Sequence, residues 1–167
     1  HWKNVGPAEV PAKRLWTYRY CTWFGRAHGI PFKMPPRHPF NPLKPLRLAV
    51  ALWAKPEAVG AIFDFIWAEG RDPAEPSEWR ALGERLGVAD PDSATEAPAV
   101  KDALRANTEA AIRQGVFGVP SFVIGGEVFW GVDATDFVLQ ALDDPGLLRD
   151  PEYRRIAALP AGAERKR

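Results

Sequence analysis

The residues best suited to chemistry in this sequence lie in a short stretch of its C-terminal third. Val119 and Pro120 follow a glycine-containing segment, 115–118, and precede a run of β-prone residues. A proline at the start of a strand donates no hydrogen bond to a neighbouring strand. If the Val119–Pro120 peptide bond is cis, the backbone at Val119 turns outward and offers its N–H and C=O to an extended ligand. Spacing alone leaves this open, because a trans proline at a sheet edge is the commoner case.

Asp133 is a second candidate because it precedes apolar residues at helical spacing. Asp136 follows three residues later, so the pattern predicts that Asp133 is the N-cap of a helix with an acidic first turn. Trp130 closes the preceding β-prone run and is either the floor of a ligand site or a core aromatic residue. The residues themselves leave both alternatives open.

Metal, nucleotide and thiol chemistry have little support. The three histidines, His1, His28 and His38, are not at metal-ligand spacing from one another or from the single Cys21, which we expect to be a buried small side chain. Glycine-rich nucleotide loops, the zinc-protease helix motif and the nucleophile elbow do not occur in the sequence. We therefore expect no bound metal.

Composition sets further limits on partners and compartment. The 22 Lys and Arg against 21 Asp and Glu give a formal charge of +1, so nucleic acid and anionic membranes are not expected partners. No apolar run approaches the roughly 18 residues that cross a bilayer. One cysteine forms no internal disulfide, which fits a reducing compartment, and we expect a cytoplasmic protein.

The candidate residues depend on a chain that is mostly helical. Periodicity and helix stops predict helices over 9–27, 46–53, 57–69, 78–86 and 99–114, a core helix after Asp133 and a short tail helix over 152–159. In the first helix, one apolar stripe joins Ala12, Trp16, Tyr20, Trp23 and Ala27.

Two segments between the helices are predicted to be irregular. Residues 31–42 hold five prolines and are expected to form an extended connector. Lys33, Arg37 and His38 in this connector are candidates for an acidic substrate, although solvated loop charges are commoner. Residues 90–98 are expected to be a polar turn region.

The β-prone runs 121–124 and 127–130 flank Gly125-Gly126, which predicts a β-hairpin. A two-stranded hairpin is marginal in water and usually needs more strands or a covering layer. Either the helices alone cover it, or residues before His1 supply an N-terminal βαβ half. The start at His1 rather than Met favours the second expectation.

Several of these motifs together resemble a known family. The segment 115–120 before a strand, the Gly-Gly hairpin and the sequence Phe-Trp-Gly-Val-Asp at 129–133 are similar to the C-terminal half of the thioredoxin-fold family that contains 2-hydroxychromene-2-carboxylate isomerase and kappa-class glutathione transferase. Lys-Asn-Val-Gly-Pro at 3–7 and Phe-Ile-Trp-Ala-Glu-Gly at 65–70 extend the resemblance, which covers most of 1–143.

The resemblance implies an α/β, thioredoxin-like fold, DsbA-like and helix-rich, with a large all-helical insertion. Residues 1–8 would be a loop from the thioredoxin part, 9–98 the insertion, 99–143 the C-terminal half of the thioredoxin domain and 144–167 a tail. The family's first strand and helix, which carry a serine in place of the thioredoxin cysteine, would lie before His1, so the catalytic residue is not in this chain.

The resemblance also implies glutathione as cofactor. Val119, before a cis Pro120, would pair its backbone with the cysteinyl unit. The Asp133 carboxylate would take the glutamyl ammonium, and the N–H groups of Val132 and Asp133 its carboxylate. Trp130 and Asn4 are further candidate contacts, although an Asn shortly before Gly-Pro commonly only starts a turn. Val132 and Ala134 depart from the polar neighbours that some members have beside this aspartate.

The activity implied is glutathione-dependent cis–trans isomerisation between 2-hydroxychromene-2-carboxylate and an o-hydroxybenzylidenepyruvate-type unsaturated keto acid. The thiol of the cofactor would add to the substrate, allow rotation and leave. The alternatives are a kappa-like glutathione transferase, which releases the adduct, and a non-catalytic helical binding module. The expected partner is a small aromatic keto acid or chromene carboxylate, and seven Trp leave room for a homodimer face.

Overall fold

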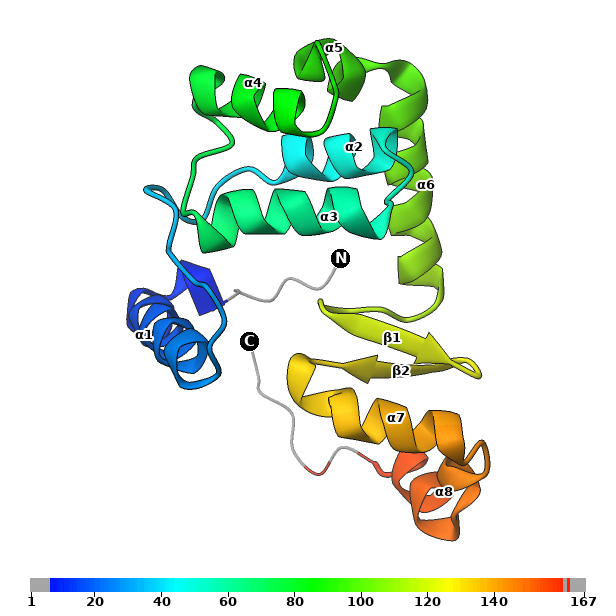
Figure 1. The fold of residues 1–167 in the computed structure, drawn as a ribbon. Coiled ribbons are helices and arrows are strands. Elements are labelled where there is room, and N and C mark those ends of the chain that lie inside the picture. The colour runs from blue at the N-terminus through cyan, green and yellow to red at the C-terminus, as the bar shows by residue number, and fades with distance from the viewer. Residues whose placement is uncertain (1–6, 161, 163–167) are drawn as a thin grey trace. The chain divides into compact units, whose positions relative to one another are not determined.

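The computed structural model describes residues 7–160 and 162 (Figure 1). The chain divides into two compact units, 1–108 and 109–167, each with its own core. In chain order the elements are η1 (Pro7–Glu9), α1 (Pro11–Ala27), α2 (Leu43–Ala51), α3 (Pro56–Phe63), the π-helical turn η2 (Asp64–Ala68), α4 (Pro76–Arg85), α5 (Pro91–Glu96), α6 (Pro98–Arg113), β1 (Ser121–Ile124), β2 (Glu127–Trp130), η3 (Val132–Ala134), α7 (Thr135–Asp143), η4 (Leu147–Arg149) and α8 (Pro151–Ala157).

Helices α2, α3 and α4 enclose the core of the first unit. Its fully or nearly fully buried side chains are Leu48, Ile62, Phe65, Ile66, Trp79 and Leu82. Proline occupies the first turn of α1, α3, α4 and α5, where its missing N–H costs no helical hydrogen bond. At the end of α2, Trp53 and Ala54 have φ of 60° and 49°, a left-handed stop that usually falls to glycine.

One predicted turn region is a helix. Residues 90–98 include α5, because Asp90 accepts a hydrogen bond from the Ser93 N–H at 2.9 Å and Pro91 fits the first helical position. Asp-Pro is common in turns as well as at helix starts, so the sequence prediction of a turn was wrong here.

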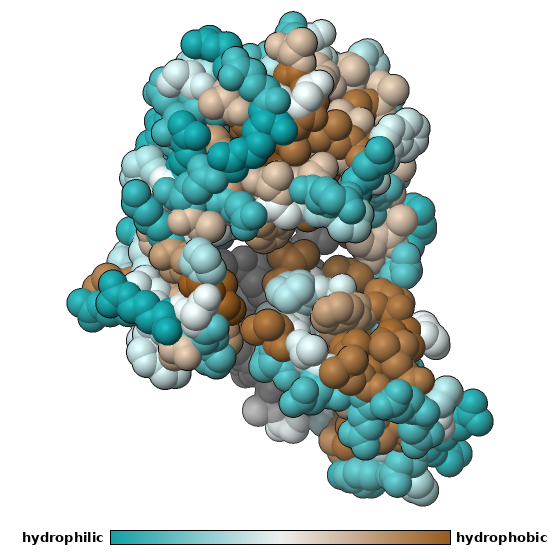
Figure 2. All heavy atoms as spheres, in the orientation of Figure 1, coloured by the Kyte–Doolittle hydropathy of each residue, from teal (hydrophilic) through white to brown (hydrophobic). Residues whose placement is uncertain are grey.

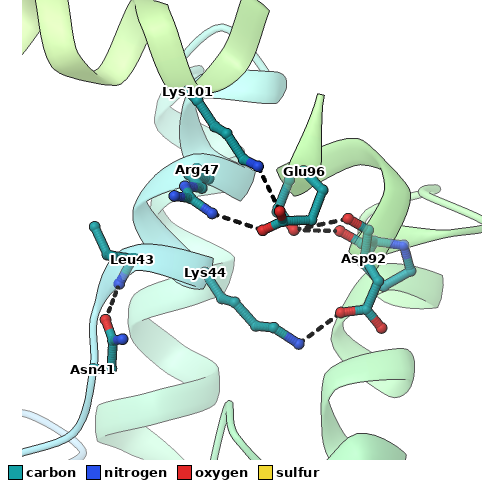
Figure 3. A network of polar contacts seen from close by, with 9 residues as sticks. Asn41, Leu43, Lys44, Arg47, Asp92, Glu96 and Lys101 are labelled. Carbon is teal, nitrogen blue, oxygen red and sulfur yellow. Dashed lines mark hydrogen bonds and ion pairs between the residues drawn. The ribbon is translucent and has the colours of Figure 1, made fainter. Parts of the chain in front are cut away.

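Ion pairs join α5 to α2 and α6 at the surface (Figure 3). Lys44 pairs with Asp92 at 2.6 Å, and the Glu96 carboxylate receives both Arg47 and Lys101. The hydrogen bond from Lys101 has the largest effect and lowers the pKa of Glu96 below its ordinary value; the charges of Lys101, Arg47 and Lys44 act in the same direction, and burial opposes them. This cluster fixes α5 on the outside of the helical unit.

Residues 28–42 contain no helix or strand, as the prolines predict. Side chains hold this connector in place instead. Arg37 binds the buried Asp72 carboxylate at 2.6 Å, and the Tyr18 hydroxyl lies 2.7 Å from His38 Nδ1 and 3.0 Å from the His38 carbonyl oxygen. The His38–Pro39 peptide bond is cis.

Strands β1 and β2 form the predicted antiparallel hairpin in the second unit. Ser121 pairs with Trp130 and Ile124 with Glu127, and both residues of the Gly125-Gly126 turn have positive φ, as a type I′ turn requires. Helix α7 packs on this sheet through Val138 and Ala141 against Phe129. Among the described residues the sheet has these two strands.

Candidate functional site

The hairpin register brings the candidate residues of the second unit to one end of the sheet. Ser121 and Trp130 are partners in the ladder, and the Gly131 N–H donates to the Pro120 carbonyl oxygen at 2.9 Å. Val119, one residue before this bond, and the turn that contains Asp133, just after it, therefore lie at the same end of the hairpin. Val119 and Asp133 are 14 residues apart in the sequence, and the pairing of β1 with β2 brings them to the same end of the sheet.

Val119 has the outward backbone that the sequence pattern predicts. The Val119–Pro120 bond is cis, which confirms the prediction, and the residue is 87% exposed. Neither its N–H nor its C=O makes a hydrogen bond to any part of the chain that the structure describes. Both groups are free to pair with an extended ligand.

Trp130 supports the segment before Val119. Its ring centroid lies 5.4 Å from that of Phe117, and its indole covers Gly118 so closely that a Cβ built there would meet Nε1 at 2.5 Å. The indole is half exposed, so Trp130 is not a core residue. It acts as a wall that holds the Gly118–Val119 backbone in place.

Asp133 does not cap the helix, and that prediction was wrong. Helix α7 begins at Thr135 and makes no side-chain cap hydrogen bond, while Asp133 lies inside the preceding 3-10 turn η3. Ala134 precedes α7 and Gly131 precedes η3, so Asp133 holds neither capping position. The Asp133 side chain folds back over Gly131, close to where a Cβ would stand.

Asp133 therefore places a free carboxylate beside free backbone N–H groups. The exposed Asp133 carboxylate has no hydrogen bond or ion pair with the described residues, and neither do the backbone N–H groups of Val132 and Asp133. A helix-start carboxylate next to free N–H groups suits a ligand group that carries both an ammonium and a carboxylate. Val132 and Ala134 contribute no polar side chain to such a ligand.

Other candidates are engaged or lie elsewhere. Arg37 and His38 are anchors of the connector rather than free ligands, and Asn4 lies outside the described residues. Cys21 is half-buried rather than buried. No group of three or more His, Cys, Asp or Glu side chains able to hold a metal ion occurs among the described residues.

Sequence patterns contain no sign of the Tyr18–His38 pair, because its partners are twenty residues apart on a helix and an irregular segment. Burial, and then the nearby Arg14 cation, lower the pKa of His38 below its ordinary value of 6.5. Phe40 and Trp67 lie edge-on around the imidazole, with ring centroids 6.0 and 5.5 Å away. The neutral imidazole is therefore favoured in the fold.

A cavity of about 490 Å³ opens at the other end of the hairpin, lined by residues that include Phe129, Ala141, Leu148, Glu127 and Arg149. It lies at the Gly-Gly turn and not beside Val119. The candidate site is thus an exposed edge of backbone and carboxylate rather than a closed pocket.

In the described part of the chain, no helix is long and apolar enough to cross a membrane.

A family model and curated proteins match this chain. The family model of the DSBA-like thioredoxin domain matches residues 2–143. A 2-hydroxychromene-2-carboxylate isomerase of Sphingobium xenophagum is 35% identical over 89 residues, covering 52% of this chain and 45% of the relative. One from Pseudomonas putida is 29% identical over 142 residues, covering 78% of this chain and 66% of the relative.

A solved structure of a 2-hydroxychromene-2-carboxylate isomerase superposes with a TM-score of 0.66 at 20% identity, covering 90% of this chain and 75% of that one. This likeness shows the predicted thioredoxin-like, helix-rich fold. The chain spans about half to two thirds of the length of the curated relatives it matches. The predicted domain borders at 8, 98 and 143 stay predictions. From the match over residues 2–143, the chain belongs to the DSBA-like thioredoxin-domain family, with 2-hydroxychromene-2-carboxylate isomerases among its relatives.

Proposed function

We propose that this protein is a glutathione-dependent isomerase that interconverts 2-hydroxychromene-2-carboxylate and an o-hydroxybenzylidenepyruvate-type unsaturated keto acid. One observation carries the proposal: the unused backbone N–H and C=O of Val119 and the unused carboxylate of Asp133 lie at the same end of the hairpin. The names of the relatives support the choice of substrate. We place the activity in the cytoplasm, where glutathione stays reduced.

The site fits the two recognition features of glutathione. The tripeptide is extended, and Val119 offers an N–H and a C=O that no described residue uses. Its γ-glutamyl end carries an ammonium and a carboxylate, which match the Asp133 carboxylate and the N–H groups of Val132 and Asp133. Trp130 keeps the Val119 backbone in position from behind Gly118.

Glutathione, when bound, supplies a thiol nucleophile that can add reversibly to a conjugated double bond and so permit rotation. The described residues bind and orient the tripeptide.

The test is to incubate the natural protein with 2-hydroxychromene-2-carboxylate and to follow the products by chromatography. We expect the open keto acid to form with glutathione and not with S-methylglutathione, which keeps the peptide and lacks the thiol. Release of a glutathione conjugate instead would identify a transferase. Absence of both turnover and glutathione binding would leave a non-catalytic binding module, and either result overturns the proposal.

A further inference from the structure

The cavity at the Gly-Gly end of the hairpin is lined by residues that all belong to the second unit. Its volume of about 490 Å³ lies in the range of small-molecule sites, about 300–1,000 Å³. The buried Phe129 and Ala141 and the half-buried Leu148 give it an apolar floor. Figure 2 shows hydrophobic side chains gathered on the surface over the hairpin and α7. The apolar part of a small ligand can therefore leave water here.

Hydrogen-bond acceptors lie where α7 ends at this cavity. Pro145, four residues after Ala141, has no N–H, so the Ala141 carbonyl oxygen lacks the partner that a longer helix would supply. No other described group donates to it. The Asp144 carboxylate lines the same cavity and accepts only the Gly146 N–H, at 2.8 Å. Free carbonyl groups at a helix C-terminus, together with a carboxylate, favour a cation.

Two opposite charges of the lining have no partner. Glu127, exposed on β2, and Arg149, exposed at the end of η4, form no ion pair or side-chain hydrogen bond with the described residues. They do not pair with each other although both line one cavity, so a single ligand that carries both charges can lie between them. Arginine binds a carboxylate through two parallel hydrogen bonds, and a carboxylate such as that of Glu127 accepts from an ammonium.

We propose that this cavity binds a free α-amino acid with an apolar side chain. Its ammonium contacts the carboxylates of Glu127 and Asp144, and its carboxylate contacts the Arg149 guanidinium. Its side chain packs on Phe129. An amine that lacks the carboxylate leaves Arg149 unpaired beside a second cation, and a carboxylate that lacks the amine leaves the acceptors without a donor. Both are therefore weaker ligands than the amino acid.

The test of the ligand class is calorimetric titration of the natural protein with L-phenylalanine, phenethylamine and phenylpropionate. The three probes share an aromatic ring and differ in their charged groups. We expect L-phenylalanine to bind at least about tenfold more tightly than either analogue, since each analogue loses one charge-assisted contact. An analogue that binds as tightly as L-phenylalanine, or the failure of L-phenylalanine to bind, would overturn the proposal.

The roles of the two charges are tested by Arg149→Gln and Glu127→Gln. We expect Arg149→Gln to lose the preference for L-phenylalanine over phenethylamine, and Glu127→Gln to lose the preference over phenylpropionate. Arg105→Gln and Glu109→Gln are the matched controls, because these residues of α6 are exposed, lie outside the cavity lining and have no described ion pair. Both controls are expected to keep the parent's preferences. Unchanged preferences in the two cavity variants would contradict the assigned contacts.

The place of binding needs its own test, because Asp133 is proposed above to hold the ammonium of glutathione. We expect L-phenylalanine to shift the amide NMR signal of Gly125, which lines the cavity, and not that of Gly118, before β1. Asp133→Asn is expected to bind L-phenylalanine as the parent does. The Gly125 signal reports this site whether or not glutathione binds. A shift of the Gly118 signal alone, or loss of binding in Asp133→Asn, would place the amino acid in the other site and overturn the proposal.

Discussion

The free carboxylate of Asp133 allows a change of charge with little change of packing. In Asp133→Asn the side chain keeps its size, and no described hydrogen bond or ion pair is lost. A charge-assisted hydrogen bond contributes about 1.5–3 kcal/mol, so glutathione affinity is expected to fall about 10- to 150-fold by calorimetric titration. The melting temperature is expected to stay where it is.

Asp143→Asn, at the far end of α7, is the control for the general electrostatic field and is expected to leave the affinity unchanged. If Asp133→Asn binds glutathione as the parent does, Asp133 has no part in holding the glutamyl ammonium.

His38 links the stability of the first unit to pH. Because burial and Arg14 lower its pKa in the fold, the unfolded chain takes up a proton first as the pH falls below the ordinary value of 6.5. The stabilisation by neutral His38 is therefore complete above that pH and is lost progressively on acidification. We expect denaturant titrations at pH 7.5 and pH 5 to differ more for the parent than for His38→Asn.

His28 provides the comparison for this experiment, since it is exposed at the end of α1 and its Nδ1 lies 2.9 Å from the Phe24 carbonyl oxygen. His28→Asn is expected to keep the parent's acid sensitivity. A parent and a His38→Asn variant with the same pH dependence would refute the role assigned to this imidazole.

At the scale of elements, the segment before β1 depends on the space that Gly118 leaves for Trp130. A methyl group at Gly118 must displace the indole, and overpacking of this kind costs about 1–3 kcal/mol. We expect Gly118→Ala to destabilise the protein by that amount and to weaken glutathione binding at Val119. In a Trp130→Ala background the same substitution is expected to cost little.

Gly60→Ala is the control for Gly118→Ala, because it places the same methyl group where a helix has room for it. Gly60 lies inside α3, and no neighbouring atom comes within 4 Å of the place that an alanine methyl group would take, so alanine is expected to stabilise the protein by about 0.5–1 kcal/mol. Chemical denaturation of the four variants measures all these changes. A Gly118→Ala cost that persists without the indole would show that Trp130 is not its cause.

Sequence patterns predicted the elements whose signals are local. The Gly125-Gly126 turn between two β-prone runs is sufficient for the hairpin, and five prolines are sufficient to exclude regular structure from 31–42. Spacing alone did not predict the cis Val119–Pro120 bond, and the family resemblance was needed to predict it. The first helix was predicted with an apolar stripe, but periodicity states which residues share a face and not which face meets the core.

The site was predicted less completely because its geometry depends on backbone angles and on distant partners. Whether Asp133 caps α7 depends on where the helix begins, and the 3-10 turn η3 takes up Asp133 before α7 begins at Thr135. The Tyr18–His38 pair depends on the packing of the connector against α1, and Asp90 as a cap depends on α5 packing on α2. The Tyr18–His38 pair leaves no signal in neighbouring residues, and Asp-Pro at 90–91 is typical of turns as well as of helix starts.

At the scale of the whole molecule, the two units have cores of different size. The first buries Phe65, Trp79 and Leu82 completely, whereas the second relies on Phe129, Val138 and Ala141. We expect native-state amide exchange to be slower in α3 and α4 than in β1 and β2. Equal protection in both units would show that they unfold together, and saturating glutathione is expected to slow exchange in the second unit first.

Two tryptophans of the first unit, Trp79 and Trp53, differ most in solvent contact, and this difference gives the unit an optical signal of its own. Trp79 is buried in the core, whereas Trp53, just after the end of α2, is almost fully exposed. Iodide in solution reaches an indole only where water does, so it quenches the long-wavelength emission of Trp53 and leaves the blue-shifted emission of Trp79. Loss of that protected emission on heating reports when α2, α3 and α4 separate, without any added dye.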